Sequence, residues 1–97
     1  MARRIVPAAH PESPRIRTAA DLGAFIRAQR TEQGLRIDDA AMLCGVSVAL
    51  LSALENGSER GVALNKALHI AQQLGLDVLV ASRRNSADLE SCLDRKL

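Results

Sequence analysis

Apolar residues recur at helical spacing through the middle of the chain, and helix start signals precede each run. Leu22 and Ile26 fall on one face of a segment that follows Thr18 and Asp21. Those two residues have the spacing of a capping box, with Asp in place of the usual Glu or Gln. The pattern predicts a helix over residues 19–33.

Two shorter helices are predicted next, joined by a tight turn. Asp38 suits the first turn of a helix over 37–44, because a carboxylate stabilises the positive end of the helix dipole. Gly45 is suited to end that helix, and Ser47 to cap a second one over 47–56. Two short helices connected in this way form the helix-turn-helix pattern.

The second helix of this pair has two distinct faces. Val46, Leu50 or Leu51, and Leu54 repeat at helical spacing and are expected to pack on the core. In a helix-turn-helix, the opposite face of the second helix is offered to the DNA major groove. That face is unusually apolar here, and it carries Ser47, Val48, Ala49, Ser52 and Ala53.

A further helix is predicted over residues 63–74, after which the periodicity changes. The expected core positions of this helix are Leu64, Leu68, Ala71 and Leu74. The run at 77–82 is typical of a short β-strand, which needs a partner for its backbone groups. Since no other segment resembles a strand, the expected partner is the same strand of a second copy, through the dimer residues Val78, Leu79 and Val80.

The two ends of the chain lack this periodicity. Residues 1–17 hold three prolines and four arginines and are expected to form a flexible basic arm. Such an arm is either a disordered tail or a segment that lies along DNA phosphates. Residues 83–97 form a polar tail that is compatible with a frayed helix over 88–96. Between the two ends lie the helix-turn-helix domain, 18–76, and the dimerisation strand, 77–82.

Composition limits the class of protein. The 97 residues allow one small domain, and with one Phe and no Trp or Tyr its core must be aliphatic. A net charge of +2 is compatible with nucleic acid but is weak support for it. No apolar run approaches the roughly 18 residues that cross a bilayer, and no signal peptide is apparent. A cytoplasmic protein that does not engage a membrane is expected.

Residues with catalytic or metal-binding chemistry are not grouped at useful spacings. Cys44 and Cys92 lack metal-ligand spacing, and Cys44 is expected to be a small buried hydrophobe. Neither His10 nor His69 lies near a cysteine or carboxylate at ligand spacing, and no serine has a nearby base. We therefore expect neither an enzyme nor a bound metal or other cofactor.

The stretch from Leu22 to Leu76 resembles the Xre type of helix-turn-helix regulator, akin to the lambda and Cro repressors. The matching residues are spread over the predicted helices and turns: Arg27 and Arg30, Gly34-Leu35, Ala41, Gly45-Val46-Ser47, Leu51-Ser52, Leu54-Glu55-Asn56-Gly57, and Ala71 with Leu74-Gly75-Leu76. The resemblance implies a mainly α, lambda-repressor-like domain of four to five short helices with an added C-terminal β-strand. It also implies a homodimer that binds a palindromic operator in double-stranded DNA.

The appended strand and short tail look like those of HipB-type antitoxins. That resemblance implies a transcriptional autorepressor in a toxin–antitoxin operon, with a HipA-type toxin kinase as a partner. Arg30 and Glu55 match the family pair that ties the first helix to the end of the recognition helix. Asn56, Arg60 and Lys66 fall near the loop that touches phosphates in the family, and Arg36 is a further candidate for a phosphate contact.

The chain departs from the family pattern at the positions that would read DNA. Ile37 stands where a Gln often supports the backbone contact, and Val48, Ala49 and Ala53 replace residues that form hydrogen bonds with bases. Three interpretations stay open. The protein binds DNA mainly through phosphates and groove shape, with contacts to thymine methyls. Alternatively, Ile37, Val48, Ala49 and Leu50 hold a protein partner such as a toxin kinase, or the apolar surface has no special meaning.

Overall fold

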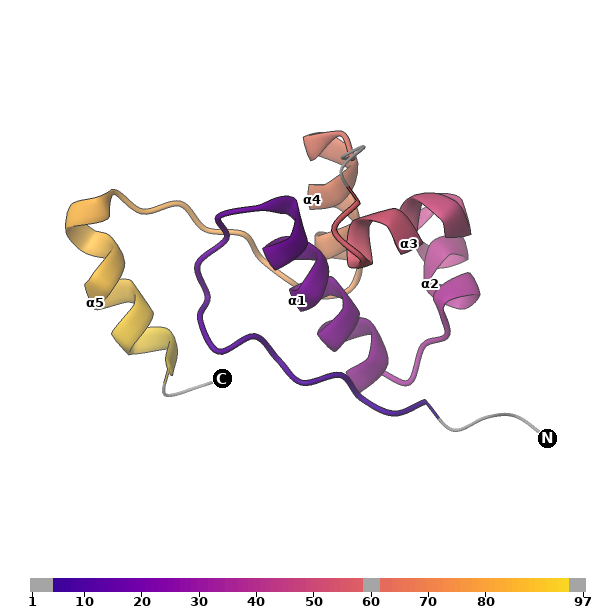
Figure 1. Cartoon of the computed structure of the whole chain (residues 1–97), viewed down its shortest axis with the longest axis horizontal. Coiled ribbons are helices and arrows are strands. Elements are labelled where there is room, and N and C mark those ends of the chain that lie inside the picture. The colour runs from indigo at the N-terminus through magenta and orange to yellow at the C-terminus, as the bar shows by residue number, and fades with distance from the viewer. Residues whose placement is uncertain (1–4, 59–61, 95–97) are drawn as a thin grey trace.

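Five helices and their connecting segments make up the described part of the chain (Figure 1). The computed structural model describes residues 5–58 and 62–94. The helices are α1 (Ala19–Glu32), α2 (Ile37–Cys44), α3 (Val48–Glu55), α4 (Leu64–Gln73) and α5 (Arg83–Asp94). In Figure 1, α1 to α4 form one group, in which α3 contacts α1 and α2 and α2 contacts α4, and α5 stands apart from this group. The first four helices agree with the predicted ones to within about one residue at each end, which is the usual uncertainty of helix boundaries.

The predicted capping signals operate at α1 and α3. The hydroxyl of Thr18 accepts a hydrogen bond from the Asp21 backbone N–H, and the Asp21 carboxylate accepts one from the Thr18 N–H, each at 3.2 Å. The hydroxyl of Ser47 accepts a hydrogen bond from the Leu50 N–H at 3.0 Å. These bonds satisfy backbone donors that the first turn of a helix leaves unpaired.

Gly45 makes the turn between α2 and α3. Its φ of 70° lies in the left-handed region, which a residue with a Cβ adopts only at a cost. The N–H groups of Gly45 and Val46 donate to the carbonyls of Met42 and Ala41 at 3.2 and 3.0 Å, closing the end of α2. The chain then bends by 109° between α2 and α3, within the range of a helix-turn-helix.

Helices α1 and α3 approach each other closely at Gly23. A Cβ added at this position would lie 1.9 Å from the backbone carbonyl oxygen of Leu54. Any larger residue would therefore force the two backbones apart, because the interior has little free volume. Sequence analysis did not single out Gly23, since a glycine inside a helix ordinarily only weakens it.

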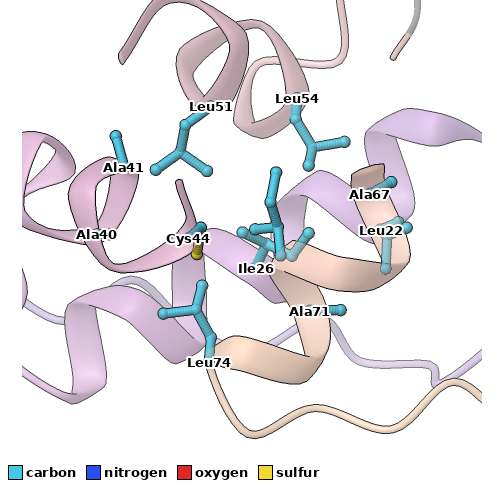
Figure 2. Packing of buried hydrophobic residues seen from close by; sticks show 11 residues of the cluster. Leu22, Ile26, Ala40, Ala41, Cys44, Leu51, Leu54, Ala67, Ala71 and Leu74 are labelled. Atoms are coloured by element: carbon cyan, nitrogen blue, oxygen red, sulfur yellow. The ribbon is translucent and has the colours of Figure 1, made fainter. Parts of the chain in front are cut away.

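The core is aliphatic, as composition predicted, and joins the first four helices. In Figure 2, Leu51 and Leu54 reach from α3 toward Ile26 of α1. Cys44 is buried in the same cluster, which confirms its predicted role as a small hydrophobe. The full cluster comprises Leu22, Ile26, Ala40, Ala41, Cys44, Leu51, Leu54, Ala67, Ile70, Ala71 and Leu74.

The predicted core face of α4 was partly wrong. Leu64 is 69% exposed, and Leu68 is only half-buried. The buried stripe starts at a different residue and keeps the helical spacing i, i+3, i+4 and i+7. It consists of Ala67, Ile70, Ala71 and Leu74.

Residues 77–82 form no β-strand in the single described chain, so the predicted C-terminal strand is not present there. The segment is irregular, and residues 5–58 and 62–94 contain no strand with which it could pair. A strand is defined by hydrogen bonds to a neighbouring strand, which the described residues of one copy do not supply. Leu79 and Val80 are 66% and 95% exposed.

The C-terminal tail contains a longer helix than predicted. Helix α5 begins at Arg83, well before the expected start at residue 88. The N–H groups of Asn85 and Ser86 both donate to the Ser82 carbonyl, at 3.0 and 2.9 Å, which starts the first turn. Figure 1 shows this helix at the end of an irregular connection that leads away from α4.

The N-terminal arm has no regular secondary structure over residues 5–17, yet it makes defined contacts. The Ala8 N–H donates to the Thr31 hydroxyl of α1 at 2.8 Å. Farther along, Arg15 forms an ion pair with Glu90 of α5. In Figure 1 the arm runs along α1 and then passes between α1 and α5. The described part of the predicted flexible arm is therefore attached to both helices.

No single described helix is long and apolar enough to cross a bilayer. Only α2 and α3 taken together, despite the bend between them, reach that length and hydropathy.

Candidate nucleic-acid interface

Helix α3 presents to solvent the face that was predicted to enter the DNA groove. Leu51 and Leu54 are buried against the core, which turns the opposite side of the helix outward. On that side Val48 is 43% exposed, Ala49 is exposed and Ala53 is half-buried. These three side chains can offer a ligand only methyl groups.

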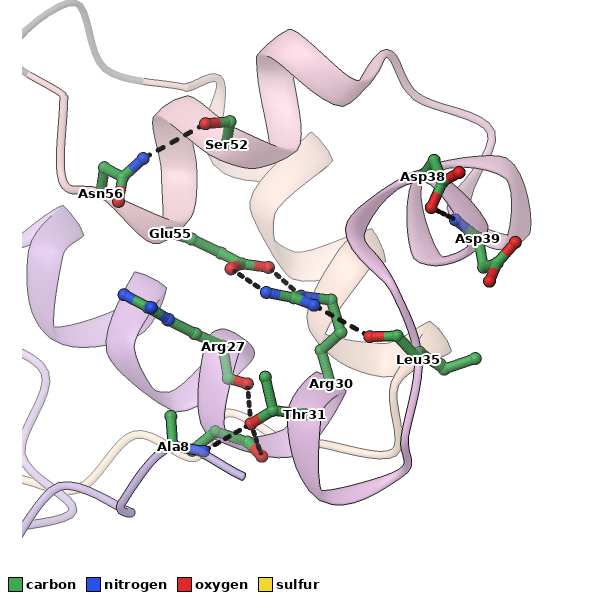
Figure 3. Close-up of polar contacts among 11 residues, drawn as sticks. Ala8, Arg27, Arg30, Thr31, Leu35, Asp38, Asp39, Ser52, Glu55 and Asn56 are labelled. Atoms are coloured by element: carbon green, nitrogen blue, oxygen red, sulfur yellow. Dashed lines mark hydrogen bonds and ion pairs between the residues drawn. The ribbon is translucent and has the colours of Figure 1, made fainter. Parts of the chain in front are cut away.

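The polar side chains of this face are hydrogen-bonded within α3 itself. The hydroxyl of Ser47 is used as the N-cap, and the Asn56 amide donates to the Ser52 hydroxyl at 3.2 Å. In Figure 3, Ser52 and Asn56 lie on the opposite side of α3 from Glu55. Part of their hydrogen-bonding capacity is therefore already used.

An ion pair with α1 fixes the position of α3. The Arg30 guanidinium donates from Nε and Nη2 to the two Glu55 carboxylate oxygens, at 2.7 and 2.8 Å (Figure 3). The two side chains are only 11% and 4% exposed. Arg30 Nη1 also donates to the Leu35 carbonyl at 2.9 Å. The predicted pair is confirmed, and Arg30 connects α1, the following loop and α3.

Helix α2 adds apolar surface close to the start of α3. Met42 and Leu43, in its last turn, are 82% and 53% exposed. Ile37 and Leu50, which the protein-binding interpretation includes, are half-buried and pack against the core. That interpretation consequently depends mainly on the exposed residues of the two helices.

Positive charge is sparse around this surface. Arg36 contacts Asp38 at 3.5 Å across an exposed pair, and Asp39 lies in the same first turn of α2. Lys66 is exposed in the first turn of α4. Arg60, a predicted phosphate contact, lies outside the described residues. The described part of the domain thus offers few cations for DNA phosphates.

Charge is distributed unevenly along the chain. The helix-turn-helix domain holds five basic and six acidic residues, whereas the arm holds four arginines and one glutamate. Arg15 and Arg17 are within the described part of the arm, and the other two, Arg3 and Arg4, are outside it. The net positive charge of the chain is therefore concentrated in the arm.

Cys44 and His69 lie where α2 and α4 meet. Burial raises the pKa of the Cys44 thiol, which keeps it protonated and unreactive. His69 Nε2 lies 3.1 Å from the Cys44 carbonyl oxygen and links α4 to α2. Within the part of the chain that the structure describes, no group of His, Cys, Asp and Glu could hold a metal ion.

Sequence analysis missed the link between the arm and the last helix. Arg15 and Glu90 are separated by 75 positions, and the hydroxyl of Ser13 donates to the same carboxylate at 3.2 Å. None of these residues belongs to a recognisable motif, and long-range pairing of exposed charges has no periodic signal. Only the folded path of the arm brings them together.

Comparison with known proteins assigns the domain to a family. A family model described as a helix-turn-helix domain matches residues 21–83. The chain belongs to this family. An uncharacterized HTH-type transcriptional regulator, y4mF of Sinorhizobium fredii (strain NBRC 101917 / NGR234), is 39% identical over 72 residues. That match covers 72% of this chain and 93% of the relative, and the predicted resemblance to Xre-type regulators is confirmed.

Solved structures share the fold. A chain of a HipA–HipB–O2–O3 complex has a TM-score of 0.62 and 22% identity, with 71% of this chain and 96% of that chain covered. At this identity the likeness shows the fold alone. The restriction-modification controller protein C.AhdI from Aeromonas hydrophila has a TM-score of 0.54 and 29% identity, with 61% and 88% covered. The mainly α helix-turn-helix fold is thereby confirmed.

Proposed function

We propose that this protein is a sequence-specific DNA-binding regulator of transcription that inserts α3 into the major groove. The observation that carries the proposal is the α2–turn–α3 unit, held against α1 with one face of α3 outward. In a helix-turn-helix, residues at the start of the second helix contact base edges while the first helix crosses the backbone. Val48 and Ala49 occupy that starting position here.

Further contacts follow from the same placement. Residues along the outward face of α3 and at its ends would line the groove, namely Ser47, Ser52, Ala53 and Asn56. The basic residues around the unit would contact phosphates, namely Arg36, Arg60 and Lys66, together with the arm arginines. Positive charge is concentrated in the arm, which supports the assignment of many of these phosphate contacts to the arm.

We infer that the protein acts as a homodimer on a palindromic operator. Val78, Leu79 and Val80 are exposed, and no backbone–backbone hydrogen bond between described residues involves 77–81. A second copy of the segment would supply the missing partners as an intermolecular ribbon. A two-fold dimer would then contact two half-sites about one helical turn apart.

The operon context that we propose is a toxin–antitoxin pair, with this protein as antitoxin and autorepressor. The fold likeness to a chain of a complex that contains HipA and HipB supports this context. The expected partner is a HipA-type kinase encoded beside this gene, and it should co-purify with the protein. A neighbourhood without such a gene would count against the antitoxin role and leave DNA binding untouched.

A second candidate function is protein binding through the same face. Met42 and Leu43 favour it, because exposed apolar side chains next to one another often mark interaction sites. In that case the outward side of α3 and the end of α2 would hold a partner protein, and the isolated protein would bind no DNA.

A mobility shift of the protein's own promoter at about 50 mM and about 200 mM salt tests the proposal. A specific shift at low salt that weakens by about 10³-fold at high salt is expected for roughly six phosphate contacts. A promoter fragment that is not retarded at either salt, or no better than a shuffled fragment, would overturn sequence-specific DNA binding.

A further inference from the structure

We propose that α3 recognises thymine through its 5-methyl group, by van der Waals contact rather than by hydrogen bonds to base edges. The inference rests on the proposed DNA-binding function and names the base chemistry that the helix accepts. Val48 and Ala49, the first two residues of α3, make the contact.

Helix α3 lacks the side chains that read guanine and adenine by hydrogen bonds. Direct reading of guanine uses Arg or Lys, and direct reading of adenine uses Asn or Gln. Helix α3 contains none of these residues. Asn56 follows at its C-cap, far from the base-reading start of the helix, and its amide already donates to Ser52. The chemistry that remains at the start of α3 is methyl surface.

Only one base offers a matching group in the major groove. Thymine carries a C5 methyl there, whereas the other bases present hydrogen-bond donors and acceptors alone. A cytosine in its place carries only a hydrogen at C5, and its amino group takes the position of the thymine O4. Selectivity for thymine therefore comes from the methyl group that Val48 and Ala49 bury.

The shape of the outward face allows such contacts. Ala49, Ser52 and Ala53 lie on this face at helical spacing, and all three side chains are small. With no long side chain in the way, the helix backbone can approach the floor of the groove. Val48 is 43% exposed at the edge of the face, so part of its surface is available to a base. Methyl groups that meet at about 4 Å gain from dispersion and from the removal of apolar surface from water.

The experiment removes the methyl from the DNA and leaves everything else unchanged. The full chain is titrated against promoter fragments in which single thymines are replaced by deoxyuridine, which keeps pairing and charge. Each contacted thymine should cost about fourfold in affinity when its methyl is removed, which corresponds to about 0.8 kcal/mol. Replacement of thymines outside the two half-sites that the protein contacts is the control, and it should not change the affinity.

A variant links the effect to the helix. Val48→Ala should weaken binding to the thymine fragment and abolish the discrimination between thymine and uracil at one position of each half-site. Thermal unfolding of Val48→Ala checks that the domain is still folded. If the parent binds its promoter specifically but binds every uracil fragment equally well, methyl recognition is wrong while DNA binding stands. If the parent binds no promoter fragment, the proposed function fails as well.

Discussion

Arg30 in α1 and Glu55 at the end of α3 form a bidentate ion pair, with N–O distances of 2.7 and 2.8 Å, although 25 positions separate them in the sequence. Both side chains are nearly buried. The pair therefore holds α3 in a fixed position relative to α1. Two parallel hydrogen bonds between the guanidinium and the carboxylate make the pair stronger and more directional than a single contact would be.

Loss of one partner should destabilise the domain. Glu55→Ala is expected to lower the free energy of unfolding by about 3 kcal/mol, because it leaves the Arg30 charge buried without a counter-ion. Urea denaturation followed by circular dichroism measures this change. A double variant, Arg30→Met with Glu55→Leu, should lose less than the single variant, since apolar groups can fill the site.

The exposed pair between Arg36 and Asp38 provides the matched control for this prediction. Asp38→Ala removes a carboxylate from a surface contact and should change the free energy of unfolding by about 1 kcal/mol at most. Comparable losses from Glu55→Ala and Asp38→Ala would contradict a special role for the buried pair.

The fold was predictable where local signals and the core pattern agree. The capping box at Thr18, the Ser47 cap and the turn at Gly45 are short-range features, and the structure contains each of them. Helix α4 was placed correctly, but its core face was predicted only in part, because Leu64 and Ala67 both fit an apolar stripe. Packing against the other helices decides which of these stripes is buried. The sequence of α4 alone does not predict it.

The candidate site was predictable to the extent that it follows from helix geometry. Burial of Leu51 and Leu54 places Ala49 on the opposite face and Val48 at the edge of that face, so their orientation follows from helical spacing. The bond from Arg30 to the Leu35 carbonyl was not predictable, because it depends on the path of a loop. The structure of residues 77–82 was not predictable from this sequence alone either. Their apolar run forms a strand only if a second chain supplies a strand that pairs with it.

The proposed dimer can be tested at Leu79. Leu79→Pro removes a backbone donor from the segment 77–82 and should weaken self-association by at least tenfold if the ribbon forms. Leu79→Thr is the control, because it keeps the backbone donor and a strand-forming side chain. Sedimentation velocity over a concentration series measures both variants. A parent protein that is monomeric, or a proline variant that dimerises as well as the parent, would refute the ribbon.

The arm should contribute to the salt dependence of DNA binding. With roughly six phosphate contacts per dimer, the slope of log affinity against log salt is expected to be about −5. The double change Arg15→Gln and Arg17→Gln should make the slope shallower by about 1 for each phosphate that the variant no longer neutralises. The matched change Arg83→Gln and Arg84→Gln removes the same charge from α5 and should leave the slope near its parent value. Equal effects of the two double variants would argue against a specific role for the arm.

Acid should loosen the contact between the arm and α5. The hydrogen bond from Arg15 holds the pKa of Glu90 below its usual value. A carboxyl with a depressed folded-state pKa contributes stability above its unfolded pKa of about 4.3, and loses it as pH falls through the folded value. A carbon-13 NMR titration should therefore find that Arg15→Gln raises the pKa of Glu90. Arg17→Gln should have a smaller effect, because Arg17 acts only as a more weakly interacting charge. A Glu90 titration that is unchanged in Arg15→Gln would show that the link is absent in solution.

The outward face of α3 separates the two candidate functions most directly through Ala49. Ala49→Glu places a carboxylate where the proposed complex has base edges and phosphates, so operator binding should fall by at least 10²-fold through charge repulsion and burial of an unpaired charge. The fold should persist, because Ala49 is exposed and Glu is a good helix former. Ala87→Glu makes the same chemical change on an exposed position of α5 and should leave binding unaltered. Mobility shifts on the promoter, with circular dichroism for the fold, compare the three proteins.

In the protein-binding alternative, the parent itself leaves DNA unshifted, and Ala49→Glu disrupts only the complex with the partner. A parent and an Ala49→Glu variant that shift the promoter equally would remove α3 from the groove and leave the arm and the segment after Gly57 as the contact.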